Sequence, residues 1–303
     1  MESVLKSIAV CQSAKIVKKV EAGWSSDVKY YVLDAHNREY MLRLSDISQD
    51  QSKRIEFERI QNFNTLDFEM SRAVEFGTCN AGSMVYMLLT WVAGESLESS
   101  LKVLSEQKQY ELGIKAGKIL KAIHDLPTIE VVDVLAKKEK MLEKLARYER
   151  CGYRVEQDDK IINYIKSHLD DLNDLKAVMN HGDYHVGNLI LTSDFEVGVI
   201  DFNRMQVSDH VEDFYKVQSF NVEVSIPFSI GQIHGYFQGN PSEEFWKVLA
   251  LYNAYAALNS ITWATKFGQE EIEGMIRRCR QTMKDYDSFT QVEIGRASCR
   301  ERV

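Results

Sequence analysis

The residues most able to do chemistry lie in one short stretch, "HGDYHVGNLI" at residues 181–190, and in "VIDFN", which follows it. Asp183 and Asn188 are five positions apart, and Asp201 comes thirteen positions after Asn188, at the end of an apolar run. A carboxylate can accept a proton, and a carboxylate with an amide oxygen can hold a hard cation. The pattern predicts acid–base chemistry or metal binding, beside the simpler interpretation that each aspartate stabilises a turn.

A zinc site is a second interpretation. His181, Asp183 and His185 alternate along the stretch and carry side chains that bind zinc. Alternate residues of a strand share one face, but no residue nearby is a clear fourth ligand. Phosphoryl transfer explains more of the pattern.

Phosphoryl transfer needs a carboxylate that accepts a hydrogen bond from the attacking hydroxyl, and oxygen ligands that hold Mg²⁺ against the phosphates. The metal ligands must come from neighbouring strands if their oxygens are to converge. A hairpin from Asn188 to Asp201, turning at "TSDFE", meets that need. The spacing of Asp183 and Asn188 is also that of the protein-kinase catalytic loop.

On these residues the chain resembles the aminoglycoside phosphotransferase family, with "AIHDLP" and "SDHVEDF" as further points of likeness over roughly residues 20–285. The resemblance implies an α+β, bilobal protein-kinase-like fold, with a β-rich N-terminal lobe and a mainly helical C-terminal lobe. It implies that Asp183 is the catalytic base and that Asn188 and Asp201 bind Mg²⁺. We expect His181 to brace the loop and His185 to be structural.

The N-terminal lobe is expected over residues 1–93. Two β-rich runs flank the polar "DAHN", which is typical of a hairpin, and "SKRIEFERIQNF" suits a helix that packs Ile55, Ile60 and Phe63 on a sheet. The apolar run "SMVYMLLTWV" is of strand length, and Gly94 then interrupts it.

The resemblance assigns nucleotide contacts to this lobe. Ser25 and Ser26 lie in "EAGWSSDVKYYV", where such folds cover the phosphates, although the chain lacks a G-x-G-x-x-G pattern there and an ordinary turn is the alternative. Arg43 stands where a lysine usually contacts the α- and β-phosphates, and it keeps the charge but not the shape of lysine. Glu56 is its expected helix partner, ahead of Glu58.

The hinge between the lobes is expected at "YMLLTWVAGESL". By the same likeness, Thr90 and Val92 contact the adenine through main-chain groups.

The C-terminal lobe is expected over residues 94–292, with helices before and after the catalytic stretch. Helical spacing brings Tyr255, Asn259 and Trp263 near one face, which predicts either core packing or an acceptor pocket. Nearby acidic residues could meet substrate amines, although charge runs on helices are usually solvated: Glu270, Glu271 and Glu273.

Composition excludes several classes of protein. The net charge of −8 disfavours a nucleic-acid partner and mildly favours a cationic small molecule. No apolar segment is long enough to cross a membrane, and no signal peptide is recognisable. The five cysteines have no metal-ligand spacing, so we expect free thiols in a cytoplasmic protein.

Residues 293–303, "EIGRASCRERV", carry no apolar period. One codon choice for them matches a common sequencing adapter. We therefore hypothesise that this tail is not native and that the natural C-terminus is missing.

We expect an ATP- and Mg²⁺-dependent phosphotransferase that acts on a small-molecule hydroxyl, with an aminoglycoside as the leading acceptor. Choline, homoserine, sugar and macrolide kinases share the fold and stay open as alternatives. A catalytically silent nucleotide-binding module is a third possibility, which the presence of Asp183, Asn188 and Asp201 disfavours. A protein-substrate kinase is disfavoured because D-F-G and A-P-E segments are absent from the sequence.

Overall fold

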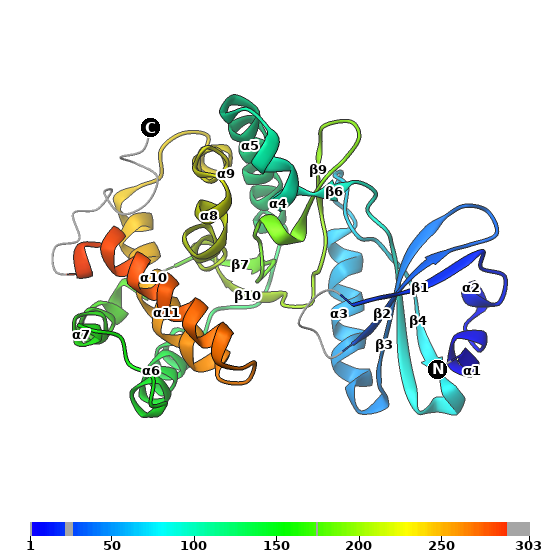
Figure 1. Cartoon of the computed structure of the whole chain (residues 1–303), viewed down its shortest axis with the longest axis horizontal. Coiled ribbons are helices and arrows are strands. Elements are labelled where there is room, and N and C mark those ends of the chain that lie inside the picture. Colours follow the sequence, from blue (N-terminus) through cyan, green and yellow to red (C-terminus); the bar gives the residue numbers. More distant parts are fainter. Residues whose placement is uncertain (1, 22–26, 174, 290–303) are drawn as a thin grey trace. The chain divides into compact units, whose positions relative to one another are not determined.

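The computed structural model describes residues 2–21, 27–173 and 175–289 (Figure 1). Contacts divide the chain into a first unit, Met1–Glu95 with Asn188–Met205, and a second unit that holds the rest. The expected boundary at residue 93 remains a prediction. By its contacts, however, the hairpin that carries Asn188 and Asp201 belongs to the first unit, not to the C-terminal part. Residues 293–303 lie outside the described residues.

An antiparallel sheet of five strands forms the body of the first unit, in the order β1-β2-β3-β5-β4. The strands are β1 (Ile16–Val20), β2 (Val28–Leu33), β3 (Glu39–Asp46), β4 (Ala73–Cys79) and β5 (Met84–Thr90). The predicted hairpin is confirmed, because β2 and β3 pair around a turn in which Asn37 has a φ of 62°. The short helices α1 (Glu2–Lys6) and α2 (Ala9–Gln12) and the longer α3 (Asp50–Phe63) complete this part.

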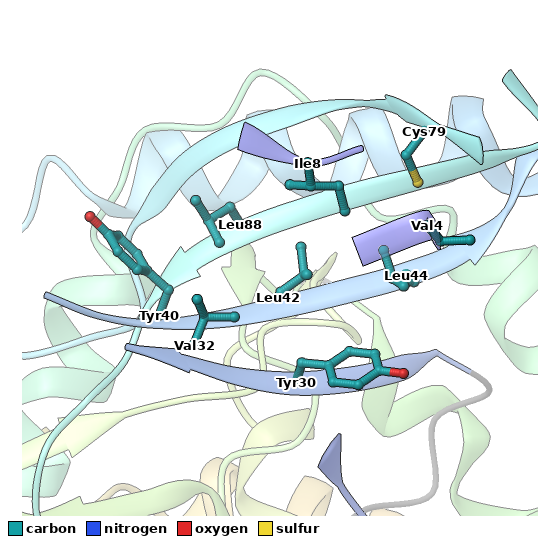
Figure 2. Packing of buried hydrophobic residues seen from close by; sticks show 9 residues of the cluster. All are labelled: Val4, Ile8, Tyr30, Val32, Tyr40, Leu42, Leu44, Cys79 and Leu88. Carbon is teal, nitrogen blue, oxygen red and sulfur yellow. The ribbon is translucent and has the colours of Figure 1, made fainter. Parts of the chain in front are cut away.

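The two faces of β3 differ in chemistry because side chains alternate along a strand. Tyr40, Leu42 and Leu44 are buried on one face, against Val4 and Ile8 from the N-terminal helices (Figure 2). Burying each large apolar side chain contributes about 1.5–3 kcal/mol, so this face anchors the strand. The opposite face is left to present Arg43.

Helix α3 packs through only part of its expected apolar set. Ile60 and Phe63 are fully buried, as predicted. The expectation for Ile55 was wrong, because its side chain is 44% exposed. The helix instead turns the polar residues Lys53 and Glu56, both largely buried, toward Arg43 on the sheet.

The second unit is mainly helical, and the α+β class is confirmed. Its helices are α4 (Leu97–Ser100), α5 (Glu106–His124), α6 (Val134–Arg150), α7 (Asp158–His168), α8 (Val222–Val224), α9 (Ile226–Phe237), α10 (Glu243–Ala264) and α11 (Gln269–Asp285). Strands β7 (Ala177–Asn180) and β10 (Gln206–Asp209) pair antiparallel beside the catalytic stretch. No helix within the described ranges is long and apolar enough to cross a membrane.

Helices α5 and α9 lie side by side at backbone distance (Figure 1). Gly113 of α5 lies against Gly231 of α9. One helical turn further along, Gly117 of α5 lies against Gln232, and Gly235 of α9 lies against Ile114. A Cβ on Gly117 would lie 2.1 Å from the carbonyl oxygen of Gln232. Only glycine permits this approach, so the four positions fix how closely the helices pack.

We expect Gly117→Ala to destabilise the protein by roughly 2–3 kcal/mol, because the new methyl group meets main-chain atoms that can yield only if the helices separate. The matched control is Gly274→Ala in α11, where the nearest atom to a new Cβ is the end of the Arg277 side chain, at 3.7 Å. The control should gain roughly 0.5–1 kcal/mol from helix propensity. Urea unfolding measures both, and equal effects would contradict the packing argument.

Candidate active site

The proposed metal ligands lie at one end of a short hairpin in the first unit. Strands β8 (Leu189–Leu191) and β9 (Val197–Val199) pair antiparallel, and the Ile200 N–H donates to the carbonyl of Asn188 over 3.0 Å. Asn188 therefore lies opposite Ile200, the residue that precedes Asp201 in the chain. Asp201 has a φ of 64°, a left-handed conformation that is uncommon outside glycine and asparagine. Such strain concentrates at functional sites.

The fully buried Asp213 of the second unit binds the backbone of the loop that carries Asp183. The carboxylate of Asp213 accepts hydrogen bonds from the backbone N–H groups of His181 (2.9 Å) and Gly182 (2.8 Å) and lies 3.0 Å from Nε2 of His124. Burial raises the pKa of Asp213, but these donors outweigh it and the net pKa is lowered. An ionised carboxylate in the interior therefore fixes the path of the loop.

Both histidines of the loop brace its backbone. His181 is fully buried, and its Nδ1 accepts from the N–H of Asp183 over 3.2 Å, as expected for a bracing residue. His185 Nδ1 accepts from the N–H of Gly187 over 3.1 Å. That hydrogen bond leaves the proton on Nε2, which lies 3.6 Å from Oδ1 of Asp183.

Asp183 itself is largely buried and lies beside a cation. Its side chain is 13% exposed, and its Oδ1 lies 2.7 Å from Nζ of Lys216. The two side chains form a largely buried salt bridge. Asp183 belongs to the second unit, whereas Asn188 and Asp201 belong to the first.

Arg43 lies in a buried network of four charges in the first unit. Its Nη1 donates to Oε1 of Glu56 over 2.5 Å, which confirms the predicted pairing, and its Nε donates to Oδ2 of Asp27 over 2.9 Å. Lys53 donates to Asp27 over 2.8 Å and to Glu56 over 3.1 Å. Two cations and two anions thus compensate each other, which offsets the desolvation cost of burying them.

The network shifts the pKa values of its members. Burial raises the pKa of Asp27, but Arg43 and Lys53 outweigh it and bring the pKa to about 2. Burial lowers the pKa of Arg43, but Glu56 and Asp27 outweigh it and the pKa is raised. Asp201 also raises the pKa of Arg43, so its charge acts on the same network.

The depressed pKa of Asp27 predicts a specific acid sensitivity. Its contribution to stability, roughly 1–2 kcal/mol after allowance for solvent screening, is complete above the ordinary pKa near 3.8 and is lost as the pH falls toward about 2. The stability difference between the wild type and Asp27→Asn should therefore shrink through that window. Urea unfolding from pH 7 to pH 2.5 measures it, with the exposed Asp194→Asn as the control for loss of one charge. A difference that stays constant with pH would exclude this role.

The expected hinge packs directly on the metal-ligand hairpin. A Cβ on Gly198 of β9 would lie 2.6 Å from Cγ1 of the buried Val92, and one on Gly94 would lie 2.2 Å from the carbonyl oxygen of Leu191. Gly94 has a φ of 145°, which favours glycine. Thr90 already uses its N–H and hydroxyl on the backbone of Arg72, at 2.9 Å each.

Ser25 and Ser26 lie outside the described residues. On the acceptor side, Tyr255, Asn259 and Trp263 share the partly exposed face of α10, and Tyr252 is buried. Core packing therefore describes Tyr252, whereas the other three side chains are partly exposed. Glu270 and Glu273 are exposed.

Sequence reasoning missed five residues that support the site: Asp27, Lys53, Asp213, Lys216 and Asn221. Lys53 had a signal, because it precedes Glu56 by one helical turn. The other four are brought to the site by contacts between distant segments. Among the described residues, His, Cys, Asp and Glu side chains nowhere gather in groups of three that could hold a metal, so the zinc interpretation gains no support.

The fold is kinase-like. Solved structures with this fold include the GDP complex of aminoglycoside 2'-phosphotransferase-IIIa (13% identity, TM-score 0.70, covering 92% of this chain and 96% of that one). A thermostable mutant of aminoglycoside phosphotransferase APH(4)-Ia in complex with AMP-PNP and hygromycin B is similar as well (12%, TM-score 0.68, 89% and 93%). So is amicoumacin kinase bound to AMP-PNP, Ca²⁺ and Ami (14%, TM-score 0.62, 91% and 91%).

The family follows from the sequence match. The model of the phosphotransferase enzyme family matches residues 16–249, and the chain belongs to this family. No curated protein matches the sequence.

Proposed function

We propose that the protein transfers the γ-phosphoryl group of ATP to a hydroxyl group of a small molecule. The observation that carries this proposal is the braced loop that presents Asp183: its backbone is fixed by the ionised Asp213, and its carboxylate is held in a mostly buried place. Phosphoryl transfer depends on such positioning more than on covalent chemistry by the protein.

The proposed reaction assigns one task to each group. The acceptor oxygen forms a bond to the γ-phosphorus, the bond from that phosphorus to the β–γ bridging oxygen breaks, and ADP leaves. Asp183 orients the acceptor hydroxyl and takes its proton. Arg43, positioned by Glu56, contacts the phosphates, and Ser25 and Ser26 cover them. The carbonyl of Thr90 and the N–H of Val92 are the proposed adenine contacts.

Asn188 and Asp201 are the proposed ligands of Mg²⁺. Their donor set fits this ion, because an amide oxygen and a carboxylate from the same end of a hairpin are hard oxygen ligands. Bound Mg²⁺ would neutralise charge on the phosphate oxygens.

An aminoglycoside is the leading proposed acceptor. The net charge of −8 and the exposed acids at the start of α11 suit a cationic molecule. Tyr255, Asn259 and Trp263 offer aromatic and amide surface to a sugar ring.

One observation favours a less cationic acceptor, such as choline, homoserine, a sugar or a macrolide. Lys137 fills the space between Asp209 and Glu212, with Nζ 2.7 Å and 2.9 Å from their carboxylates. Two acids of the second unit are thereby already compensated and are not available to substrate amines.

A turnover screen tests the proposal. ADP formation is followed with Mg²⁺·ATP across aminoglycosides, macrolides, choline, homoserine and sugars, with GTP as a parallel donor and Asp183→Asn as the negative control. We expect acceptor-dependent ADP and a product heavier by one phosphoryl group. Nucleotide that binds but does not turn over with any acceptor would instead indicate a silent nucleotide-binding module.

A further inference from the structure

The loop that carries Asp183 is held at two points by one unusual turn. Residues Val217–Asn221 form a π-helix, a rare conformation that is frequent at functional sites. Lys216 precedes this turn and pairs with Asp183, and Asn221 ends it and accepts from the N–H of Val186 over 3.0 Å. Asn221 also donates to Oε1 of Gln232 over 2.7 Å, which ties the turn to α9.

Lys216 is not a solvated surface lysine. It is 6% exposed, and its Nζ lies 5.0 Å and 5.1 Å from the ring centres of Tyr215 and Phe220. Burying an ammonium group costs several kcal/mol unless an anion and aromatic faces compensate it. The carboxylate of Asp183 lies within reach, 2.7 Å from Nζ, and supplies such an anion.

The surroundings of Lys216 restrict its movement. Phe220 stacks on His185 of the catalytic loop, with ring centres 4.8 Å apart. Its ring is also covered by Arg278, which pairs with Glu223 through two nitrogens, at 2.8 Å and 3.0 Å. Two cations with different anionic partners therefore contact the same aromatic ring.

We propose that Lys216 is a positioning residue for Asp183 and that the π-helical turn fixes its place. This inference rests on the proposed function. The ammonium group holds Oδ1, which directs Oδ2 at the acceptor hydroxyl before transfer. A misplacement of about 1 Å can cost on the order of 10²-fold in rate, so one well-placed cation has a large effect without contacting the acceptor.

The experiment compares Lys216→Met, Lys216→Gln and Lys216→Arg in the full chain. We expect Lys216→Met and Lys216→Gln to lower kcat by roughly 10–100-fold while KM for ATP changes by less than about threefold. Lys216→Arg should recover a substantial part of the loss because it restores the charge. The control is Arg278→Met, which removes the other cation on Phe220 and should leave kcat near the wild-type value.

A double-mutant cycle separates positioning from a merely structural role. If Lys216 acts through Asp183, Lys216→Met in the Asp183→Asn background should lower kcat no further. Additive losses, wild-type kcat in Lys216→Met, or Lys216→Arg no better than Lys216→Met would each overturn the inference. Thermal melts identify any variant that loses its fold, and Lys216→Gln then replaces Lys216→Met in the cycle. A wild type without turnover overturns the proposed function together with this inference, whereas an active Lys216→Met overturns this inference alone.

Discussion

Asp183→Asn should lower kcat by about 10²–10⁴-fold, the usual loss on removing a general base, while nucleotide binding persists. Asparagine has the same shape but cannot take the acceptor proton. The loop should keep its path, because Asp213 and His181 hold its backbone rather than the Asp183 side chain. The variant also removes the anion beside the buried Lys216, so a thermal melt must accompany the kinetics.

The measurement is steady-state turnover on the acceptor found by the screen, with ATP affinity from calorimetry and a thermal melt as the test of folding. Asp194→Asn on the exposed tip of the β8–β9 hairpin makes the same atomic change away from the loop and should be neutral. An Asp183→Asn enzyme with near-wild-type kcat would remove Asp183 from the mechanism.

Local patterns were sufficient to predict the elements that carry the site. Two β-rich runs around a polar turn predicted the hairpin that β2 and β3 form. Side chains alternate along β3, which puts Arg43 on the face opposite Leu42 and Leu44. Its pairing with Glu56 then required only that the helix after the strand fold back on that face.

The supporting contacts could not be predicted, because they join segments far apart in the chain. Asp213 reaches the loop from about thirty residues away, and nothing in "EDFYK" distinguishes a buried aspartate from a solvated one. In the sequence, Lys216 is indistinguishable from a surface lysine. Only the π-helical turn of the folded chain places it beside Asp183. The glycines of α5 and α9 are ordinary helix residues until the two backbones meet.

The error at Ile55 has a similar cause. Periodicity marks residues that can pack on a sheet, but not which of them the sheet has room to cover. In α3 the ion pairs of Lys53 and Glu56 determine which side of the helix faces the sheet, and Ile55 is left on the surface.

Asp201→Ala should abolish productive binding of Mg²⁺·ATP, and Asn188→Ala should weaken it less. A carboxylate gives a hard cation both a charge and an oxygen, whereas an amide gives only a dipole. Titration of turnover with Mg²⁺, and calorimetry of ATP binding with and without the ion, show which of the two variants loses more binding. If Asn188→Ala is the more damaging change, the assignment of the two ligands is wrong.

The left-handed backbone at Asp201 requires a further variant, because alanine at a φ of 64° adds strain of about 1 kcal/mol that has nothing to do with the metal. Asparagine tolerates this conformation and removes only the charge. Asp201→Asn should therefore melt close to the wild type, and it should still need far more Mg²⁺ for half-maximal turnover. If Asp201→Asn instead titrates like the wild type while Asp201→Ala fails, the loss in alanine comes from backbone strain, and the carboxylate is not a ligand.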